Sequence, residues 1–374
     1  MNVVEVLQKL IQFPSVTPED CGAQAYLISL LKPMGFEIYD LPFEGGGSYP
    51  VKNFFARRGT DGPHLCFAGH TDVVPVGDEK AWSVPPFSGE IKDGKIIGRG
   101  TSDMKGEVAA FVAALSNFKN DKGSVSLLIT GDEEADAVNG TKRVLEWMKE
   151  SDHIPDVCLV GEPSSPEYMG QSMRIGRRGS LSGVLTARGT QGHVANPHLA
   201  DNPLPRLIKF LDAISGLKLD DGLEYFPPSN LEVTSIDVGN KAGNVIPASG
   251  AAKFNVRFNT HWTYETLEQK ILGALKTVGD NFEITFNRHA MPFLTKPGAW
   301  TSLVQASVTH VMGKAPELNA GGGTSDARFI APYCPVVESG MTSKTIHHVD
   351  EYCLVQDLEK CESIYLEILK RYFV

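Results

Sequence analysis

Short apolar runs alternate with helical patterns along the first half of the chain. Residues 2–12 and 20–34 place apolar side chains at helical spacing, and a longer helix pattern begins near Met104. Five runs are apolar throughout, which is typical of strands buried on both faces of a sheet. These runs are residues 53–56, 64–68, 125–130, 157–160 and 335–338. Their alternation with helices predicts an α/β domain.

A different pattern begins near residue 180, where polar and apolar positions alternate as in strands with one solvated face. The strands are expected at residues 181–187, 231–238, 251–258 and 282–287, and helices at 203–215 and 264–278. The order β-α-β-β-α-β is the ferredoxin-like arrangement. After Pro292 the α/β pattern returns, with helices expected at 301–312 and 354–372.

This order predicts that a smaller domain is inserted into a larger one. We expect an α/β domain from residues 1–178 and 292–374, and a ferredoxin-like α+β domain from residues 179–291. The 374 residues are enough for about two to three domains of ordinary size.

Charge and composition narrow the possible partners. The chain has 35 basic and 45 acidic side chains, so its formal charge of −10 argues against a nucleic-acid or anionic-membrane partner. No apolar stretch is long enough to span a bilayer, and the first residues form an amphipathic helix pattern. We therefore expect a cytoplasmic protein. The six cysteines are scattered without a C-x-x-C pair and are expected to be reduced core thiols.

Polar side chains follow three of the buried strands directly. His70 and Asp72 follow the strand at 64–68, Glu133 and Glu134 the next, and Glu162 the third. Because the carboxyl ends of strands form the ligand crevice of an open α/β sheet, these side chains should converge. Asp103, at the start of the long helix, and His347 or His348, after the last buried run, should join them.

Each of these residues alone has an ordinary explanation. Asp103 could cap its helix, Glu133 and Glu134 could form a charged loop, and His70 could be a structural histidine. Together, the acids would repel one another unless a cation neutralised them, and histidine with carboxylate suits zinc.

Two of these residues suggest further roles. A carboxylate at Asp72 could accept the second ring N–H of His70 and orient that ligand. One of the adjacent glutamates could bind metal while the other serves as a general base toward water.

The order of short motifs resembles the dizinc aminoacylase and carboxypeptidase superfamily, and within it most closely the succinyl-diaminopimelate desuccinylases. The motifs are GHTDVVP (69–75), GRGTSDMKG (98–106), DEE (132–134), GEPSS (161–165), GRRGS (176–180), GHVANPHLADNP (192–203), GGGTSDARF (321–329) and TIHHVDE (345–351).

The resemblance implies a ligand set for two Zn²⁺ ions per subunit, with Co²⁺ as a possible substitute. Asp103 would bridge the ions, His70 and Glu162 would complete one site, and Glu134 and His347 the other. Glu133 would act as general base, with Asp72 orienting His70. The implied reaction is hydrolysis of N-succinyl-LL-2,6-diaminopimelate to succinate and LL-2,6-diaminopimelate, in lysine and diaminopimelate biosynthesis.

The resemblance also implies that residues 1–178 and 292–374 form the catalytic domain, and that the inserted domain at 179–291 is a lid through which a homodimer forms. His193 would reach the active site of the partner subunit and, with an asparagine matched here by Asn244, stabilise the developing oxyanion. Without the resemblance, His193 would read as an ordinary turn histidine.

The expected substrate contacts are Arg177, Ser180, Arg257 and Thr324. Arginine binds carboxylates in a bidentate fashion, and the succinyl group ends in a carboxylate. The chain departs from the family pattern at Ser343, Ala135 and Asp350, and Ser343 bears on succinyl binding. The alternatives are an acetylornithine deacetylase, a dipeptidase of the same superfamily, or a non-catalytic metal-binding protein.

Overall fold

The computed structural model describes residues 1–119 and 122–374, which form two compact units. The larger unit comprises Met1–Gly176, Thr295–Asn319 and Ser325–Val374. The smaller comprises Arg177–Leu294 and a short return segment, Ala320–Thr324. The return segment was placed with the catalytic domain in the sequence-based division.

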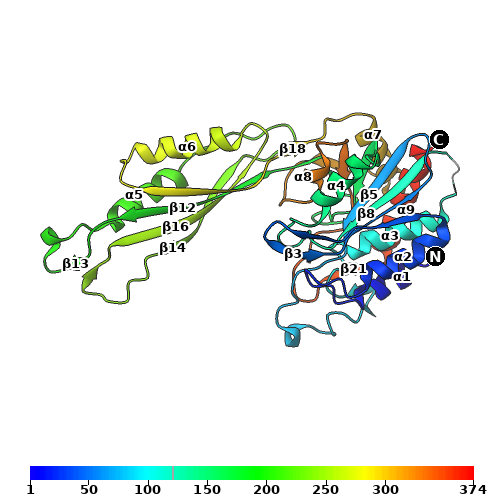
Figure 1. Cartoon of the computed structure of the whole chain (residues 1–374), viewed down its shortest axis with the longest axis horizontal. Helices are drawn as coiled ribbons and strands as arrows, with labels where there is room; N and C mark the ends of the chain where they lie inside the picture. Colours follow the sequence, from blue (N-terminus) through cyan, green and yellow to red (C-terminus); the bar gives the residue numbers. More distant parts are fainter. Residues whose placement is uncertain (120–121) are drawn as a thin grey trace. The chain divides into compact units, whose positions relative to one another are not determined.

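An eight-stranded sheet forms the centre of the larger unit (Figure 1). In sheet order its strands are β1 (Glu37–Asp40), β4 (Phe54–Arg58), β8 (Ser124–Thr130), β5 (His64–His70), β9 (Val157–Val160), β20 (Val336–Glu338), β10 (Ser172–Arg174) and β19 (Glu317–Asn319). The four inner strands β8, β5, β9 and β20 run parallel, so their carboxyl ends meet at one edge. All residues of β5, β8 and β9 are buried, as the apolar runs predicted.

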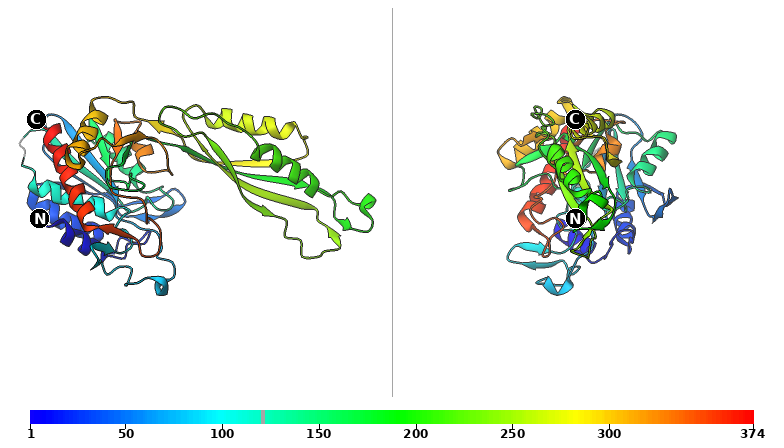
Figure 2. Two further views of the ribbon diagram at one scale, coloured as in Figure 1. Left: turned by 180° about the vertical axis from the view of Figure 1, so that it is seen from behind. Right: turned by 90° about the vertical axis from the view of Figure 1, so that its left-hand side faces the viewer.

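Helices cover both faces of this sheet, which explains why the inner strands are apolar throughout. On one face the ring of Phe67 in β5 stacks on Phe111 in α3. On the other face, Phe55 in β4 contacts Trp147 in α4. Helices α3 and α9 pack side by side (Figure 2). The helices are α1 (Val3–Ile11), α2 (Ala23–Leu31), α3 (Lys105–Asn117), α4 (Thr141–Glu150), α7 (Ala299–Met312), α8 (Ala327–Ile330) and α9 (Val355–Tyr372).

The smaller unit is an antiparallel four-stranded sheet with two helices. In sheet order the strands are β14 (Asn230–Asp237), β16 (Ser249–Phe258), β12 (Gly179–Arg188) and β17 (Glu283–Ala290). Helices α5 (Leu204–Ser215) and α6 (Tyr264–Lys276) share one apolar core with the sheet, which includes Phe210, Phe254 and Ile271. The β-α-β-β-α-β order and the alternating strand pattern are confirmed.

Short strands complete the fold. They are the three-stranded sheet β21 (Tyr352–Leu354), β7 (Lys95–Ile97) and β6 (Glu90–Lys92), and the pairs β2 (Phe43–Gly45) with β3 (Ser48–Val51), β11 (Gly176–Arg177) with β18 (Phe293–Leu294), and β13 (Gly192–His193) with β15 (Val245–Ile246). Among the described residues, no helix has the length and apolarity needed to cross a bilayer.

Candidate metal centre and hydrolytic site

The polar residues predicted to converge do so at one edge of the large sheet. Strand β5 ends at His70, the loop after β8 carries Glu133 and Glu134, and the loop after β9 carries Glu162. Because these strands are parallel neighbours, their carboxyl ends deliver the side chains to one place. Asp103 comes from the segment before α3.

Asp103 lies between two histidines. Its Oδ1 is 3.2 Å from Nε2 of His70, and its Oδ2 is 3.5 Å from Nε2 of His347. Beyond the histidines, Nε2 of His70 is 3.7 Å from Oε1 of Glu162, and Nε2 of His347 is 3.1 Å from Oε1 of Glu134. The five expected ligands thus form a continuous series, with Asp103 at its centre.

Two groups of residues at this edge, one of them including Glu133, have ligand atoms close enough to share an ion. Ligand atoms of His70, Asp103 and Glu134 all lie within 4.8 Å of one another, as do those of His70, Glu133 and Glu162. Nitrogen and carboxylate donors in this number suit zinc. Glu133 therefore lies beside the same centre, at a place where it could meet a water molecule or an ion.

The contacts of Asp72 differ in detail from the expectation. The ring Nδ1 of His70 lies 2.9 Å from the main-chain carbonyl oxygen of Asp72, whereas the nearer carboxylate oxygen is at 3.5 Å. The carboxylate instead accepts the main-chain N–H groups of Glu133 and Glu134 and the Thr17 hydroxyl. Asp72 therefore orients His70 mainly through its backbone and holds the glutamate loop through its side chain.

The charge balance of the centre also fits a cation. Burial raises the pKa of the Glu133 carboxyl well above its usual range, and the charge of Glu162 adds to this effect. Burial also raises the pKa of Glu134, although the hydrogen bond from His347 opposes it. Hydrogen bonds to Asp103 and Glu134 raise the pKa of His347 to about 10. Buried carboxylates in excess are stabilised when a divalent ion replaces the protons.

Asp132 holds the loop that presents the two glutamates. Its carboxylate accepts the N–H groups of the three residues 137–139 and the hydroxyl of Tyr49, at 2.6 Å for the hydroxyl. Tyr49 lies in β3, so the β2–β3 hairpin braces the loop. The sequence reasoning used the DEE motif only for its glutamates, and this structural role of Asp132 was missed.

Two further residues near the centre were missed. Asp326, from the GGGTSDARF motif, is buried, and its charge contributes to the raised pKa of Glu133. Glu351, from the TIHHVDE motif, is buried and accepts the main-chain N–H of Asp103 at 3.1 Å. Both lie in motifs already noted, but only the folded chain shows what they contact.

The residues expected to bind substrate lie in the smaller unit. Ser180 and Arg257 are directly paired across β12 and β16. Arg177 is buried and donates from Nη1 to the carbonyl oxygen of Gly323, the neighbour of Thr324, at 3.2 Å. These four residues therefore surround the start of β12.

His193 and Asn244 lie together beyond the other end of β12. The N–H of Val194 donates to the carbonyl oxygen of Asn244 at 3.1 Å, and His193 is paired with Val245 between β13 and β15. His193 is exposed, and its Nδ1 accepts the N–H of Ala195 at 3.0 Å. The ten-residue strand β12 separates this pair from Ser180 by roughly 30 Å at the rise of an extended strand.

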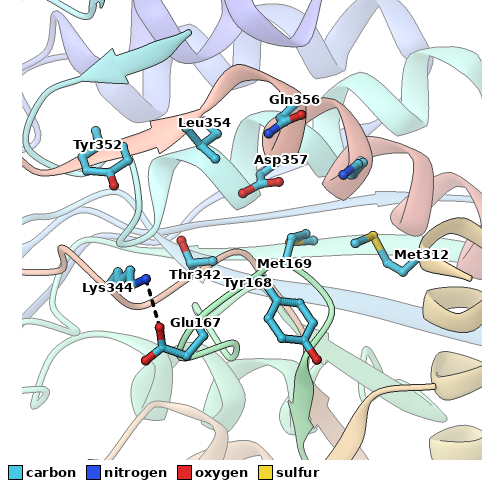
Figure 3. Close-up of a pocket in the computed structure, with 11 residues that line it drawn as sticks. Glu167, Tyr168, Met169, Met312, Thr342, Lys344, Tyr352, Leu354, Gln356 and Asp357 are labelled. Atoms are coloured by element: carbon cyan, nitrogen blue, oxygen red, sulfur yellow. Dashed lines mark ion pairs between the residues drawn. The ribbon is translucent and has the colours of Figure 1, made fainter. Parts of the chain in front are cut away.

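A cavity of about 360 Å³ borders the segment that carries His347. Thr342 and Lys344 line it from one end of this segment and Tyr352 from the other (Figure 3). Lys344 pairs there with Glu167 at 2.9 Å. The segment is also more exposed than strand β5, because His347 and His348 are exposed whereas every residue of β5 is buried.

Comparison with known proteins assigns the family. The model of peptidase family M20/M25/M40 matches residues 66–371. The chain belongs to the M20 peptidase family. Curated relatives named succinyl-diaminopimelate desuccinylase match it along its whole length. The one from Rhodospirillum centenum is 51% identical over 374 residues, covering 99% of this chain and 97% of the relative.

Solved structures of M20 proteins share the fold. An M20 family metallo-carboxypeptidase from Sulfolobus solfataricus superimposes with a TM-score of 0.78 at 20% identity, covering 100% of this chain and 99% of the other. A Bacillus subtilis protein described as a dinuclear metal binding peptidase of the M20 family gives 0.71 at 13% identity, covering 99% and 97%. The fold class and the family resemblance predicted from the motifs are confirmed.

Proposed function

We propose that this M20 chain hydrolyses N-succinyl-LL-2,6-diaminopimelate to succinate and LL-2,6-diaminopimelate, a step of lysine and diaminopimelate biosynthesis. The observation that carries the proposal is the full-length identity of about one half to relatives of that name. The histidine and carboxylate groups at the sheet edge independently support a metal-dependent hydrolase, while the choice of substrate rests on the relatives.

The centre is proposed to hold two zinc ions, with cobalt as a possible substitute. Asp103 would bridge them, with His70 and Glu162 on one side and Glu134 and His347 on the other. When bound, such ions polarise an amide carbonyl and lower the pKa of a water molecule. The position of Asp103 between the two histidines supports this assignment.

Glu133 is the proposed general base. Its carboxylate would take a proton from the attacking water, whose oxygen bonds to the succinyl carbon, and would pass the proton to the amine as the C–N bond breaks. Ligand atoms of Glu133, His70 and Glu162 lie within 4.8 Å of one another, so this carboxylate lies beside the centre at which the water would be activated. Asp72 keeps Glu133 in place by accepting its main-chain N–H.

Arg177 and Arg257 are the proposed anchors for substrate carboxylates, with Ser180 and Thr324 as neutral hydrogen-bonding partners. Burial lowers the pKa of the half-buried Arg257, yet a guanidinium stays charged at neutral pH. A partly desolvated arginine binds a carboxylate more strongly than an exposed one.

His193 is proposed to act in the active site of a partner subunit, with Asn244 beside it. The roughly 30 Å length of β12 supports this, because one small substrate could not touch both Ser180 and His193 of the same chain. We therefore propose a homodimer formed through the smaller unit. A light-scattering mass of one chain would contradict it.

Complementation tests the cross-subunit role directly. We expect His193→Ala and Glu133→Gln each to be nearly inactive alone. A mixed dimer would contain one site with an intact Glu133 and a partner's intact His193, so co-expression should restore substantial activity. Mixed dimers that stay inactive would show that His193 does not act across subunits.

Substrate choice is tested by comparing N-succinyl-LL-2,6-diaminopimelate with N-acetylornithine and a dipeptide at saturating zinc. We expect succinate release to dominate, because an acetyl group lacks the terminal carboxylate. Turnover of N-acetylornithine or the dipeptide alone would move the assignment to another M20 hydrolase.

The cytoplasm is the proposed location of this reaction. The six free cysteines, five of them buried, are compatible with that reducing compartment.

A further inference from the structure

Arg99 and Glu351 form a buried ion pair beside the proposed metal centre. Nη1 of Arg99 lies 2.6 Å from Oε2 of Glu351, and their side chains are 2% and 0% exposed. The two residues are separated by 252 positions in the chain. Neither has been given a role in the reaction above.

Glu351 organises the segment that presents Asp103. Its Oε2 accepts the N–H of Gly100 at 3.1 Å. Its Oε1 accepts the N–H groups of Ser102 at 2.9 Å and of Asp103 at 3.1 Å. One carboxylate therefore fixes the backbone conformation from which the bridging side chain projects.

Arg99 holds the segment that presents His347. Its Nη2 donates to the carbonyl oxygen of His347 at 3.4 Å, and its Nη1 to that of His348 at 3.3 Å. A further bond from Nη2 reaches Pro75, in the loop that follows β5. His347 has a φ of 62°, a left-handed conformation that persists only where the surroundings impose it.

We propose that Arg99 and Glu351 are positioning residues that set the spacing between Asp103 and His347, and so the affinity of the metal position that these two share. This inference rests on the metal centre proposed above. A buried ion pair is not in itself stabilising, because desolvation offsets the attraction. Here the pair instead satisfies main-chain groups of both ligand-bearing segments, which an apolar pair of the same volume could not do.

The test uses Glu351→Gln and Arg99→Lys in the full-length protein. Glutamine offers one acceptor oxygen in place of two and turns an NH₂ group toward N–H donors. Lysine keeps the charge but lacks the fork that reaches the carbonyl oxygens of His347 and His348. Glu283→Gln is the matched control, because it breaks an exposed arginine pair in the smaller unit.

The readout is metal affinity, measured by zinc titration of metal-free protein against a competing chelator. The spectrum of the cobalt-loaded protein is a second readout. The variant His347→Ala serves as the reference: the zinc equivalent whose affinity it lowers is the one bound at the position shared by Asp103 and His347. We expect Glu351→Gln to weaken that equivalent about tenfold or more and the other by a clearly smaller factor, because Glu351 also holds Asp103, the ligand expected to bridge both ions. The kcat should recover at saturating zinc. Arg99→Lys should shift the same equivalent by a smaller factor, and Glu283→Gln should shift neither.

Equal weakening of both equivalents, or unchanged affinities in folded Glu351→Gln and Arg99→Lys, would overturn the inference whatever the change in melting temperature. If Glu351→Gln does not fold, unchanged zinc affinity in Arg99→Lys overturns it. Failure of the parent protein to bind two equivalents would instead reject the metal centre itself.

Discussion

His70 and His347 approach the same Asp103 carboxylate from two different kinds of backbone. His70 is the last residue of β5, and its side chain is 1% exposed. His347 comes from an irregular segment, and its side chain is 48% exposed. The strand-held histidine is placed by the packing of the sheet, whereas the loop-held histidine is placed by polar contacts from Arg99 and by a strained backbone.

The ligands of one site are therefore held in place by two kinds of interaction, apolar packing on one side and buried polar contacts on the other. Strand β5 is fixed by the same apolar burial that folds the larger unit. The His347 segment borders a cavity and depends on an ion pair made by residues far apart in sequence. Changes to the core should therefore act on the His70 side, and changes to buried polar groups on the His347 side.

The largest expected effect is on turnover and concerns Glu133, whose carboxylate lies close to the strand-held His70 and to Glu162. Glu133→Gln should lower kcat by about 10²- to 10⁴-fold, because the amide cannot accept the proton from water. Zinc content, measured by elemental analysis, should stay at the parental value. A variant that loses zinc together with kcat would place Glu133 among the ligands and not as the base.

The contrast between the two histidines is tested most directly by replacing each of them with alanine in metal-free protein. We expect His70→Ala to lower the free energy of unfolding by about 3 kcal/mol, since it leaves buried carboxylates without their partner. His347→Ala should cost less, about 1 kcal/mol, because its ring is 48% exposed and water can take its place beside the buried carboxylates of Asp103 and Glu134. Urea unfolding of the two variants measures both values. Equal losses would show that the two halves are held alike.

Acid should weaken the strand-held half through His64, at the start of β5. Burial lowers the pKa of His64 to about 4, so between about pH 6.5 and 4 the unfolded chain binds a proton that the folded chain does not. The free energy of unfolding should therefore decrease as the pH is lowered across this window, by about 3 kcal/mol for this residue.

His64→Gln isolates that contribution, because the other titrating groups remain. Urea unfolding of metal-free parent and variant at pH 7 and pH 4 should give a smaller pH-dependent loss for the variant. The same loss in both proteins would remove His64 as the cause.

The smallest expected effect concerns the loop that carries Glu134, the loop-held partner of His347. Tyr49→Phe removes the hydroxyl that donates to Asp132, and should cost about 1 kcal/mol of stability. We expect kcat/KM to fall only a few-fold, with Tyr26→Phe on α2 as the control. A loss as large as that of Glu133→Gln would mean that the hairpin contributes directly to the reaction.

The same contrast explains how much could be predicted from sequence. Apolar runs predicted the inner strands, and the residues that follow them predicted the convergence of His70 with the acids, because parallel strands share an edge. The amphipathic helix α4, with its buried Val144, Leu145 and Met148, was overlooked. Strands β10 and β19, of three residues each, were too short to give a pattern.

The polar contacts that hold the centre could not be predicted in the same way. The carboxylate of Asp72 bonds to the main chain of Glu133 and Glu134, so the ring of His70 bonds to a carbonyl oxygen instead. This choice of hydrogen-bond partners depends on the position of the loop that carries Glu133 and Glu134, which is distant from Asp72 in the sequence. The pairing of Arg99 with Glu351 depends on the whole fold, and no local pattern marks it.

The most direct test of the account is succinate release from N-succinyl-LL-2,6-diaminopimelate by metal-free protein, measured as zinc is added back. We predict no release without metal and a rise to full activity as up to two equivalents bind. Succinate release by protein shown to contain no metal, at the rate of the zinc-loaded protein, would contradict the central claim that this sheet edge is a metal-dependent hydrolytic centre.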